Sequence, residues 1–249
     1  MIVLKSPAEV EKIRVSCLKA AEILEKIGEL VRPGVTTIEL DGIAEEWTRK
    51  AGGVPAFKGY RGYPNTLCVS INEGIVHGIP DQREIKEGDI VSIDFGIKYD
   101  GYFGDIAKTF AVGRLSSEAS RLIKITHDCL NKAIERVIVG NRISDISVVI
   151  QQTAEAEGFN VVREFVGHGI GRDLHEDPPV PNFGKPGMGP RIRPGLCLSI
   201  EPMVNVGTWE VEVLKDGWTA VTADRKLSAH FEHTVVATQT GPDILTERK

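Results

Sequence analysis

Apolar side chains occupy every second position in one stretch near the middle of the chain, namely Val91, Ile93, Phe95 and Ile97. Strict alternation of this kind is typical of a β-strand with one buried face. The dipeptide Asp100-Gly101 follows, and it favours a two-residue hairpin turn because both of its positions adopt positive φ. The pattern therefore predicts a β-hairpin over residues 91–110.

The predicted turn also fixes the register of this hairpin. Tyr99 is expected opposite Tyr102, and Asp94 opposite Ala107. Asp105 then becomes the diagonal neighbour of Asp94 on the same face of the sheet. An unpaired carboxylate on such a strand is costly to bury, so we expect a lysine, an arginine or a metal ion to meet Asp94.

Helical periodicity precedes the hairpin. Ser6-Pro7-Ala8-Glu9 is a capping box with proline at the first helical position, and an apolar stripe predicts a helix that runs to about Arg32. Thr36-Thr37-Ile38-Glu39 offers a second capping signal, for a helix that reaches Ala51 before Gly52-Gly53.

The order repeats after the hairpin. Ser116 or Ser117 can cap a helix that ends near Gly140, and Ile143-Ser144-Asp145-Ile146 echoes residues 35–38 and opens a helix that stops at Gly158. Strand candidates are 66–72, 89–98 and 101–112 in the first half, and 161–166, 195–201, 211–214 and 231–237 in the second. We therefore expect an α+β fold with pseudo-twofold symmetry, in one domain over residues 1–249 whose halves are about 1–113 and 114–249.

Composition narrows the classes of protein. A net charge of -5 argues against a general nucleic-acid or membrane-surface binder, and the chain has neither a secretion signal nor about eighteen successive apolar residues. We expect a soluble, cytoplasmic protein. Its four cysteines, Cys17, Cys68, Cys129 and Cys197, are too widely spaced for a zinc knuckle or a disulfide framework, and are expected as reduced, buried thiols.

Polar residues interrupt several of the apolar runs, and together they suit metal binding. They are Asp94, Asp105, His168, Glu201 and Glu232. Each alone has an ordinary explanation, as a solvent-facing or hydrogen-bonded residue. The glycines around His168 superficially resemble a phosphate loop, but residues 173–179 do not continue as a helix. Four carboxylates and one imidazole suit two divalent ions, with cobalt, manganese, iron and zinc all chemically acceptable.

Three further groups of motifs carry a resemblance. They are 59–64 with 70–73 and 77–80, then 167–171 with His175-Glu176, and finally 227–234. Over nearly its full length the chain resembles the methionine aminopeptidases of the short type I class, which have the pita-bread metallopeptidase fold. That resemblance implies a curved, mainly antiparallel sheet with helices on its outer face. It also implies removal of the initiator methionine from peptides and nascent chains whose second residue is small.

The resemblance assigns a role to each candidate ligand. Asp94 binds one metal ion, Asp105 and Glu232 bridge both, and His168 and Glu201 complete the other. A water between the two ions has a lowered pKa and attacks the first peptide bond, with Glu201 as the proton shuttle.

Other residues match positions that contact substrate or a monovalent ion. His77 is expected near the departing amide nitrogen, and His175 is expected to donate a hydrogen bond to the developing oxyanion. The methionine pocket is expected from Phe57, Tyr60, Tyr63, Cys68, Leu174 and Trp218. Leu174 replaces a phenylalanine frequent in bacterial relatives, and Phe57 replaces a smaller residue. Asn72 and Ser228 match positions that hold a structural sodium or potassium ion.

Alternatives of another kind stay open at this stage. A prolidase or aminopeptidase P relative uses a similar ligand set but normally carries a large extra N-terminal domain, for which too few residues precede Asp94. A catalytically inactive pita-bread protein that binds RNA or a partner is disfavoured by the five ligand types and the acidic composition. We expect a monomer that associates transiently with the ribosome and binds neither DNA nor membrane.

Overall fold

The structure, a computed structural model, describes residues 1–247 and contains the predicted helices. They are α1 (Pro7–Leu30), α2 (Thr37–Lys50), α3 (Ser117–Ile134) and α4 (Ile143–Ala156). Both predicted capping boxes of the first half are present, and Ser116, rather than Ser117, caps α3. The end of α3 was predicted too late, because after Ile134 the backbone tightens into short turns before Gly140.

The strands of the described residues are mostly short. They are β1 (Val54–Pro55), β2 (Leu67–Ile71), β3 (Gly74–Val76), β4 (Ile90–Tyr99), β5 (Tyr102–Ala111), β6 (Asn160–Val161), β7 (Gly167–Gly169), β8 (Glu176–Val180), β9 (Cys197–Ile200), β10 (Met203–Asn205), β11 (Val211–Val213), β12 (Ala220–Thr222), β13 (Ser228–His230), β14 (Glu232–Thr238) and β15 (Gly241–Ile244). A single-turn 3-10 helix, Tyr60–Gly62, lies between β1 and β2.

Within residues 1–247 the main sheet has nine strands in the order β1-β4-β5-β14-β9-β7-β8, with β2 also paired to β4 and β15 to β14. Every pairing in this sheet is antiparallel. The predicted hairpin is confirmed, with Tyr99 opposite Tyr102 and Asp94 opposite Ala107. Its turn residues, Asp100 and Gly101, have φ values of 45° and 81°.

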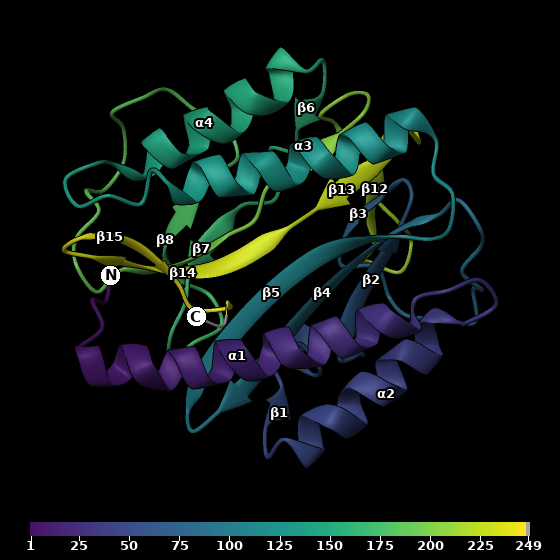
Figure 1. The fold of residues 1–249 in the computed structure, drawn as a ribbon, viewed down its shortest axis with the longest axis horizontal. Helices are drawn as coiled ribbons and strands as arrows, with labels where there is room; N and C mark the ends of the chain where they lie inside the picture. The colour runs from purple at the N-terminus through teal and green to yellow at the C-terminus, as the bar shows by residue number, and fades with distance from the viewer. Residues whose placement is uncertain (248–249) are drawn as a thin grey trace.

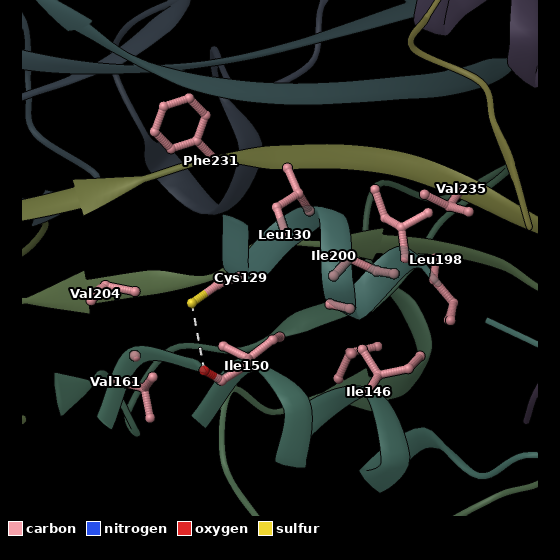
Figure 2. Close-up of a cluster of buried hydrophobic side chains, with 14 of the residues drawn as sticks. Cys129, Leu130, Ile146, Ile150, Val161, Leu198, Ile200, Val204, Phe231 and Val235 are labelled. Atoms are coloured by element: carbon pink, nitrogen blue, oxygen red, sulfur yellow. Dashed lines mark hydrogen bonds between the residues drawn. The ribbon is translucent and has the colours of Figure 1, made fainter. Parts of the chain in front are cut away.

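The helices form two pairs, and the long strands β4, β5 and β14 run between them in Figure 1. In that view α1 and α2 lie below these strands, and α3 and α4 lie above them. Gly104 on β5 lets α1 approach closely, since a Cβ there would lie 2.4 Å from the backbone nitrogen of Cys17. In Figure 2, Cys129 of α3 faces Ile150 of α4, and its Sγ lies 3.5 Å from the Ile150 carbonyl oxygen.

The register of the sheet separates its two faces. Phe95 pairs with Ile106, which pairs with His233. Cross-strand partners point to the same side of a sheet, and Phe95 and Ile106 pack in the apolar cluster that includes α1. The adjacent row contains Asp94, Ala107 and Glu232, so these side chains point away from the helices. The carboxylates therefore gather on the inner face of a sheet whose outer face carries helices, as expected.

One predicted strand was wrong for most of its length. Of residues 161–166, only Val161 belongs to β6, and the chain bends before it resumes as β7 at Gly167. Phe165 and Val166 are apolar because they line a cavity instead of pairing in a sheet. The division of one domain into halves near residue 113 stays a prediction, and that position falls in the connection between β5 and α3. Among the described residues, no helix combines the length and apolarity that crossing a bilayer requires.

Candidate metal centre

A cavity of about 310 Å³ opens on the inner face of the sheet. Its walls come from both halves of the chain. The predicted catalytic, metal-binding and methionine-pocket residues all line it: Phe57, Tyr60, Tyr63, Cys68, His77, Asp94, Asp105, His168, Leu174, His175, Glu201, Trp218 and Glu232. The structure therefore brings together residues that are up to 175 positions apart, from 57 to 232, in one place.

The five candidate metal ligands lie together in one part of the cavity. Asp105 and Glu232 are only 3% and 2% exposed. His168 Nε2 lies 4.0 Å from Asp105 Oδ2 and 3.6 Å from Glu201 Oε1. One ligand atom each from Asp105, His168 and Glu232 lies within 4.8 Å of the other two, a spacing that can surround a metal ion. Asp94 faces the same cavity from β4.

A hydrogen bond of His168 fixes which of its nitrogens is available. Its Nδ1 lies 2.9 Å from the Gly169 carbonyl oxygen, which can only accept, so Nδ1 carries the proton and donates it. Burial lowers the pKa of His168 to about 4, which keeps the imidazole neutral near pH 7. Its Nε2 therefore presents a lone pair toward the carboxylates, the arrangement usual for a metal-binding histidine.

Burial and neighbouring carboxylates strongly perturb the pKa values of the four acidic side chains. Burial and the neighbouring Asp105 raise the pKa values of Asp94, Glu201 and Glu232 well above the ordinary range. Burial also raises the pKa of Asp105 to about 7. Asp94 Oδ1 is buried without a hydrogen-bond partner. Like-charged oxygens held this close need a positive group between them.

A protein side chain does not supply that positive charge. Within residues 1–247, none of the four carboxylates forms an ion pair with lysine or arginine, and their charged-group neighbours are His168 and His230. The donor set of several carboxylate oxygens and one imidazole nitrogen fits divalent ions such as manganese, iron, cobalt or zinc. Of the partners expected for Asp94, the structure therefore favours metal over lysine or arginine.

An apolar wall borders the carboxylates. Phe57, Tyr63, Cys68 and Leu174 are buried together, and Trp218 meets the Tyr63 ring edge-on with the ring centroids 5.2 Å apart. The Tyr63 hydroxyl lies 2.9 Å from the carbonyl oxygens of Leu67 and Gly78, so its polar end is satisfied outside the cavity. One part of the cavity is therefore apolar, and it borders the part that the carboxylates line.

Two histidines stand beside this space. His77 has a φ of 59° and meets the Phe165 ring edge-on at 5.1 Å, and burial lowers its pKa to about 4. His175 is exposed to solvent, and it stacks on Tyr60 with a 15° angle between the rings. Its ring centroid lies 4.1 Å from that of His168. Both imidazoles therefore reach the cavity without belonging to the carboxylate cluster.

Sequence reasoning missed residues that support the ligands. The Ser199 hydroxyl donates a hydrogen bond to Glu232 Oε1, and His230 Nε2 lies 3.5 Å from Glu201 Oε2. A serine within the apolar run of β9 was a usable signal for Ser199. The cavity is also lined by Arg61, Val76, Glu164, Phe165 and Val166.

The residues expected at a monovalent ion lie next to each other, outside this cavity. The Ser228 backbone N–H donates to the Asn72 carbonyl oxygen at 2.8 Å. Asn72 has a φ of 56°, and its side chain donates to Asp89 at 2.8 Å. Binding of sodium or potassium there stays a prediction.

The chain is similar to known proteins over nearly its full length. The family model of metallopeptidase family M24 matches residues 11–239. Methionine aminopeptidase of Clostridium perfringens is 54% identical over 246 residues, which cover 99% of each chain. Methionine aminopeptidase 1 of Bacillus subtilis is 49% identical over 246 residues with the same coverage. Methionine aminopeptidase of Escherichia coli K12 is 46% identical over 250 residues, 100% of this chain and 95% of the relative.

Solved structures give the same result. A methionine aminopeptidase from Thermotoga maritima superposes with a TM-score of 0.98 at 46% identity, covering 100% of both chains. The prolidase of Pyrococcus horikoshii shares the fold, with a TM-score of 0.81 at 22% identity over 65% of its length. The expected pita-bread fold and resemblance are thus confirmed. The full-length similarity, together with a buried cluster of side chains that could hold a metal ion, identifies the chain as a member of metallopeptidase family M24, in its methionine aminopeptidase group.

Proposed function

We propose that the chain hydrolyses the first peptide bond of peptides and nascent proteins that begin with methionine, and releases that methionine. The observation that carries this proposal is that five candidate metal-binding side chains and an apolar wall line the same cavity. The apolar wall suits a flexible thioether side chain, and the metal-binding end suits the adjacent peptide bond.

In this proposal Asp94, Asp105, His168, Glu201 and Glu232 would hold two divalent ions, and Asp105 and Glu232 would each serve as a ligand to both. The support is the mutual proximity of ligand atoms of Asp105, His168 and Glu232, and the proton on His168 Nδ1, which leaves a lone pair on Nε2. Glu201 lies 3.6 Å from that Nε2. Such ions, when bound, acidify a water molecule so that it can attack a carbonyl carbon at neutral pH. Cobalt, manganese, iron and zinc each fit the donor set.

The chain's own residues handle the proton and the developing charge. Glu201 accepts the proton of the attacking water and passes it to the departing amide nitrogen, near which His77 lies. His175 donates a hydrogen bond to the carbonyl oxygen as it becomes an oxyanion. Its ring stands next to that of His168, and so close to the metal-binding end of the cavity. A positioned donor of this kind is worth roughly 3 kcal/mol of the barrier.

The size of the cavity bears on the choice of substrate. About 310 Å³ is at the lower limit for ligand pockets, and Phe57, Tyr63, Cys68 and Leu174 already close one side of it. A methionine side chain therefore leaves little room for the residue that follows. We propose that the second residue must be small.

The cellular setting follows from this substrate class. The enzyme acts in the cytoplasm, where nascent chains emerge, and meets the ribosome only transiently. In this proposal it works as a monomer.

The test is hydrolysis of the peptide Met-Gly-Met-Met compared with X-Pro dipeptides. The protein is first depleted of metal and then supplied with cobalt, manganese, iron or zinc, one at a time. We expect release of methionine from the first peptide with at least one metal, and no turnover without metal.

Each other outcome points to a different function. Preferential cleavage of an X-Pro bond assigns the chain a prolidase-like activity. Absence of turnover with every metal, in protein that still binds the ions by calorimetry, would make it a binding protein on the pita-bread fold. Equal cleavage of Met-Gly and Met-Leu substrates contradicts the proposed limit on the second residue.

A further inference from the structure

Lys5 precedes α1, and its ammonium group forms a buried ion pair with Glu176. The side chains are only 3% and 10% exposed. Lys5 Nζ also donates to the Val3 carbonyl oxygen at 2.9 Å. Removing both charges from water is expensive, so a buried pair is weak evidence for added stability. The role of this ion pair therefore lies in the conformation that it imposes on neighbouring residues.

The conformation in question is that of the turn between β7 and β8. Glu176 Oε1 accepts hydrogen bonds from the backbone N–H groups of Arg172, at 2.9 Å, and Asp173, at 3.4 Å. Its second oxygen, Oε2, accepts from Lys5. The carboxylate therefore closes the turn 171–176 from inside, and the lysine holds the carboxylate.

The turn carries two residues of the cavity. Leu174, which is 1% exposed, packs in the apolar wall. His175 directly precedes Glu176 and is exposed, with its ring stacked on Tyr60. The backbone of the turn sets where the His175 side chain leaves the chain, and the Tyr60 ring then supports the imidazole.

Close packing leaves Lys5 no freedom behind this turn. A Cβ on Gly171 would lie 2.4 Å from Lys5 Cε and 2.7 Å from Glu176 Oε1. On its other side the Lys5 N–H donates to the Gly195 carbonyl oxygen at 2.7 Å. A Cβ on Gly195 would lie 2.4 Å from the Lys5 carbonyl oxygen. The segment before α1 is thus fixed directly against the turn.

We infer that Lys5 is a positioning residue for peptide hydrolysis, which acts through Glu176 to hold the His175 imidazole at the cavity. This inference rests on the proposed function, in which His175 donates to the developing oxyanion. Without the ammonium group the Glu176 carboxylate loses its cationic partner and turns toward solvent. It then holds the N–H groups of Arg172 and Asp173 less firmly, and His175 loses its fixed position.

The first experiment is a double-mutant cycle. Lys5→Met, His175→Ala and the double variant are compared with the wild type, using Met-Gly-Met-Met and a saturating divalent metal. Lys5→Met should lower kcat roughly 10- to 100-fold, as loss of a supporting partner in an active site does, with KM little changed. In the His175→Ala background the same change should have almost no further effect. Lys12→Met, which removes an exposed lysine paired with Asp100, is the matched control and should keep wild-type activity.

The second experiment does not depend on turnover. Amide hydrogen exchange at Arg172 and Asp173 should become at least roughly tenfold faster in Lys5→Met, because their acceptor is released, and should not change in Lys12→Met. If Lys5→Met does not fold, Glu176→Gln takes its place in both experiments, since it weakens the same contacts without adding volume.

The outcomes separate this inference from the proposed function. An equal loss of kcat in the wild-type and His175→Ala backgrounds shows that Lys5 does not act through His175, and overturns the inference. Unchanged exchange at Arg172 and Asp173 overturns it as well. If the wild type cleaves no methionyl peptide, the proposed function fails. The exchange rates then decide alone whether Lys5 holds the turn.

Discussion

Glu232→Gln tests the metal centre most directly, because it changes the charge of one proposed bridging ligand with little change in shape. Glu232 is 2% exposed and accepts a hydrogen bond from Ser199. A glutamine keeps an oxygen for that bond, whereas Glu232→Ala leaves the serine hydroxyl without its partner, at a cost of about 1–3 kcal/mol. We expect both variants to fold and to lose activity. The glutamine variant separates the loss of the charge from the loss of the hydrogen bond with Ser199.

The size of the effect follows from mass action. A metal ion present at 100 times its dissociation constant stabilises the folded state by about 2.7 kcal/mol. For a chain of this length, about 1 kcal/mol shifts Tm by roughly 2–4 °C. The wild type should therefore gain about 5–11 °C when metal is added to the depleted protein. Glu232→Gln should lose most of this gain, while its metal-free Tm should equal or exceed that of the wild type, since burial of a carboxylate is avoided.

Thermal melts with and without manganese measure the shift, and peptide hydrolysis measures activity. Loss of a supporting residue in a metal site costs roughly 10–100-fold in activity, so loss of a ligand should cost at least ~100-fold. Glu11→Gln is the matched control, because Glu11 is exposed and its ion-pair partner among residues 1–247 is Arg14, on the same helix surface. A Glu232→Gln variant with the full metal-induced shift in Tm and wild-type turnover would refute the bridging role.

Three further predictions address other parts of the molecule. His175→Ala should lower kcat by roughly 100- to 1000-fold with little change in KM, because the donated hydrogen bond forms in the transition state; a change confined to KM in steady-state assays would contradict this. Metal-free Asp105→Asn should gain stability over metal-free wild type as pH rises from about 4 to 7. The folded-state pKa of Asp105 is raised to about 7. Its contribution to wild-type stability is therefore fully present below the unfolded pKa and is lost progressively as the pH rises toward about 7. Urea midpoints at several pH values measure the difference, which should grow by at most about 1.4 kcal/mol per pH unit, and a constant difference would show that Asp105 is not perturbed. Gly104→Ala should destabilise the protein by about 1–3 kcal/mol, because a Cβ would meet the Cys17 backbone nitrogen at 2.4 Å, and equal urea midpoints for variant and wild type would contradict the close approach of α1.

Much of the fold was predictable because its signals are local. A capping box needs four residues, and Ser6 with Glu9 was enough to begin α1 correctly. Asp100-Gly101 fixed the register of the longest hairpin. β3 and β7 have three residues each, which is too short to show alternation, and the sequence did not predict them. Phe165 and Val166 have the composition of a strand but serve as cavity lining.

The candidate site likewise contains residues that the sequence reveals and residues that it does not. Carboxylates that interrupt apolar runs, such as Asp94 and Glu201, are visible in the sequence because they are costly to bury. Which residues support them is decided by pairing between distant strands. His230 meets Glu201, and Lys5 meets Glu176, only after the chain has folded. Periodicity contains no information on contacts between segments so far apart.

The position of strand β14 in the sequence determines when, during synthesis, the candidate metal centre can form. This strand pairs with β5 of the first half and with β9 of the second, and it carries Glu232. A polypeptide under synthesis has no complete centre until residue 232 has been added. The growing chain therefore cannot act on other polypeptides before β14 has been made and paired. A product cut short before β14 is inactive rather than partly active.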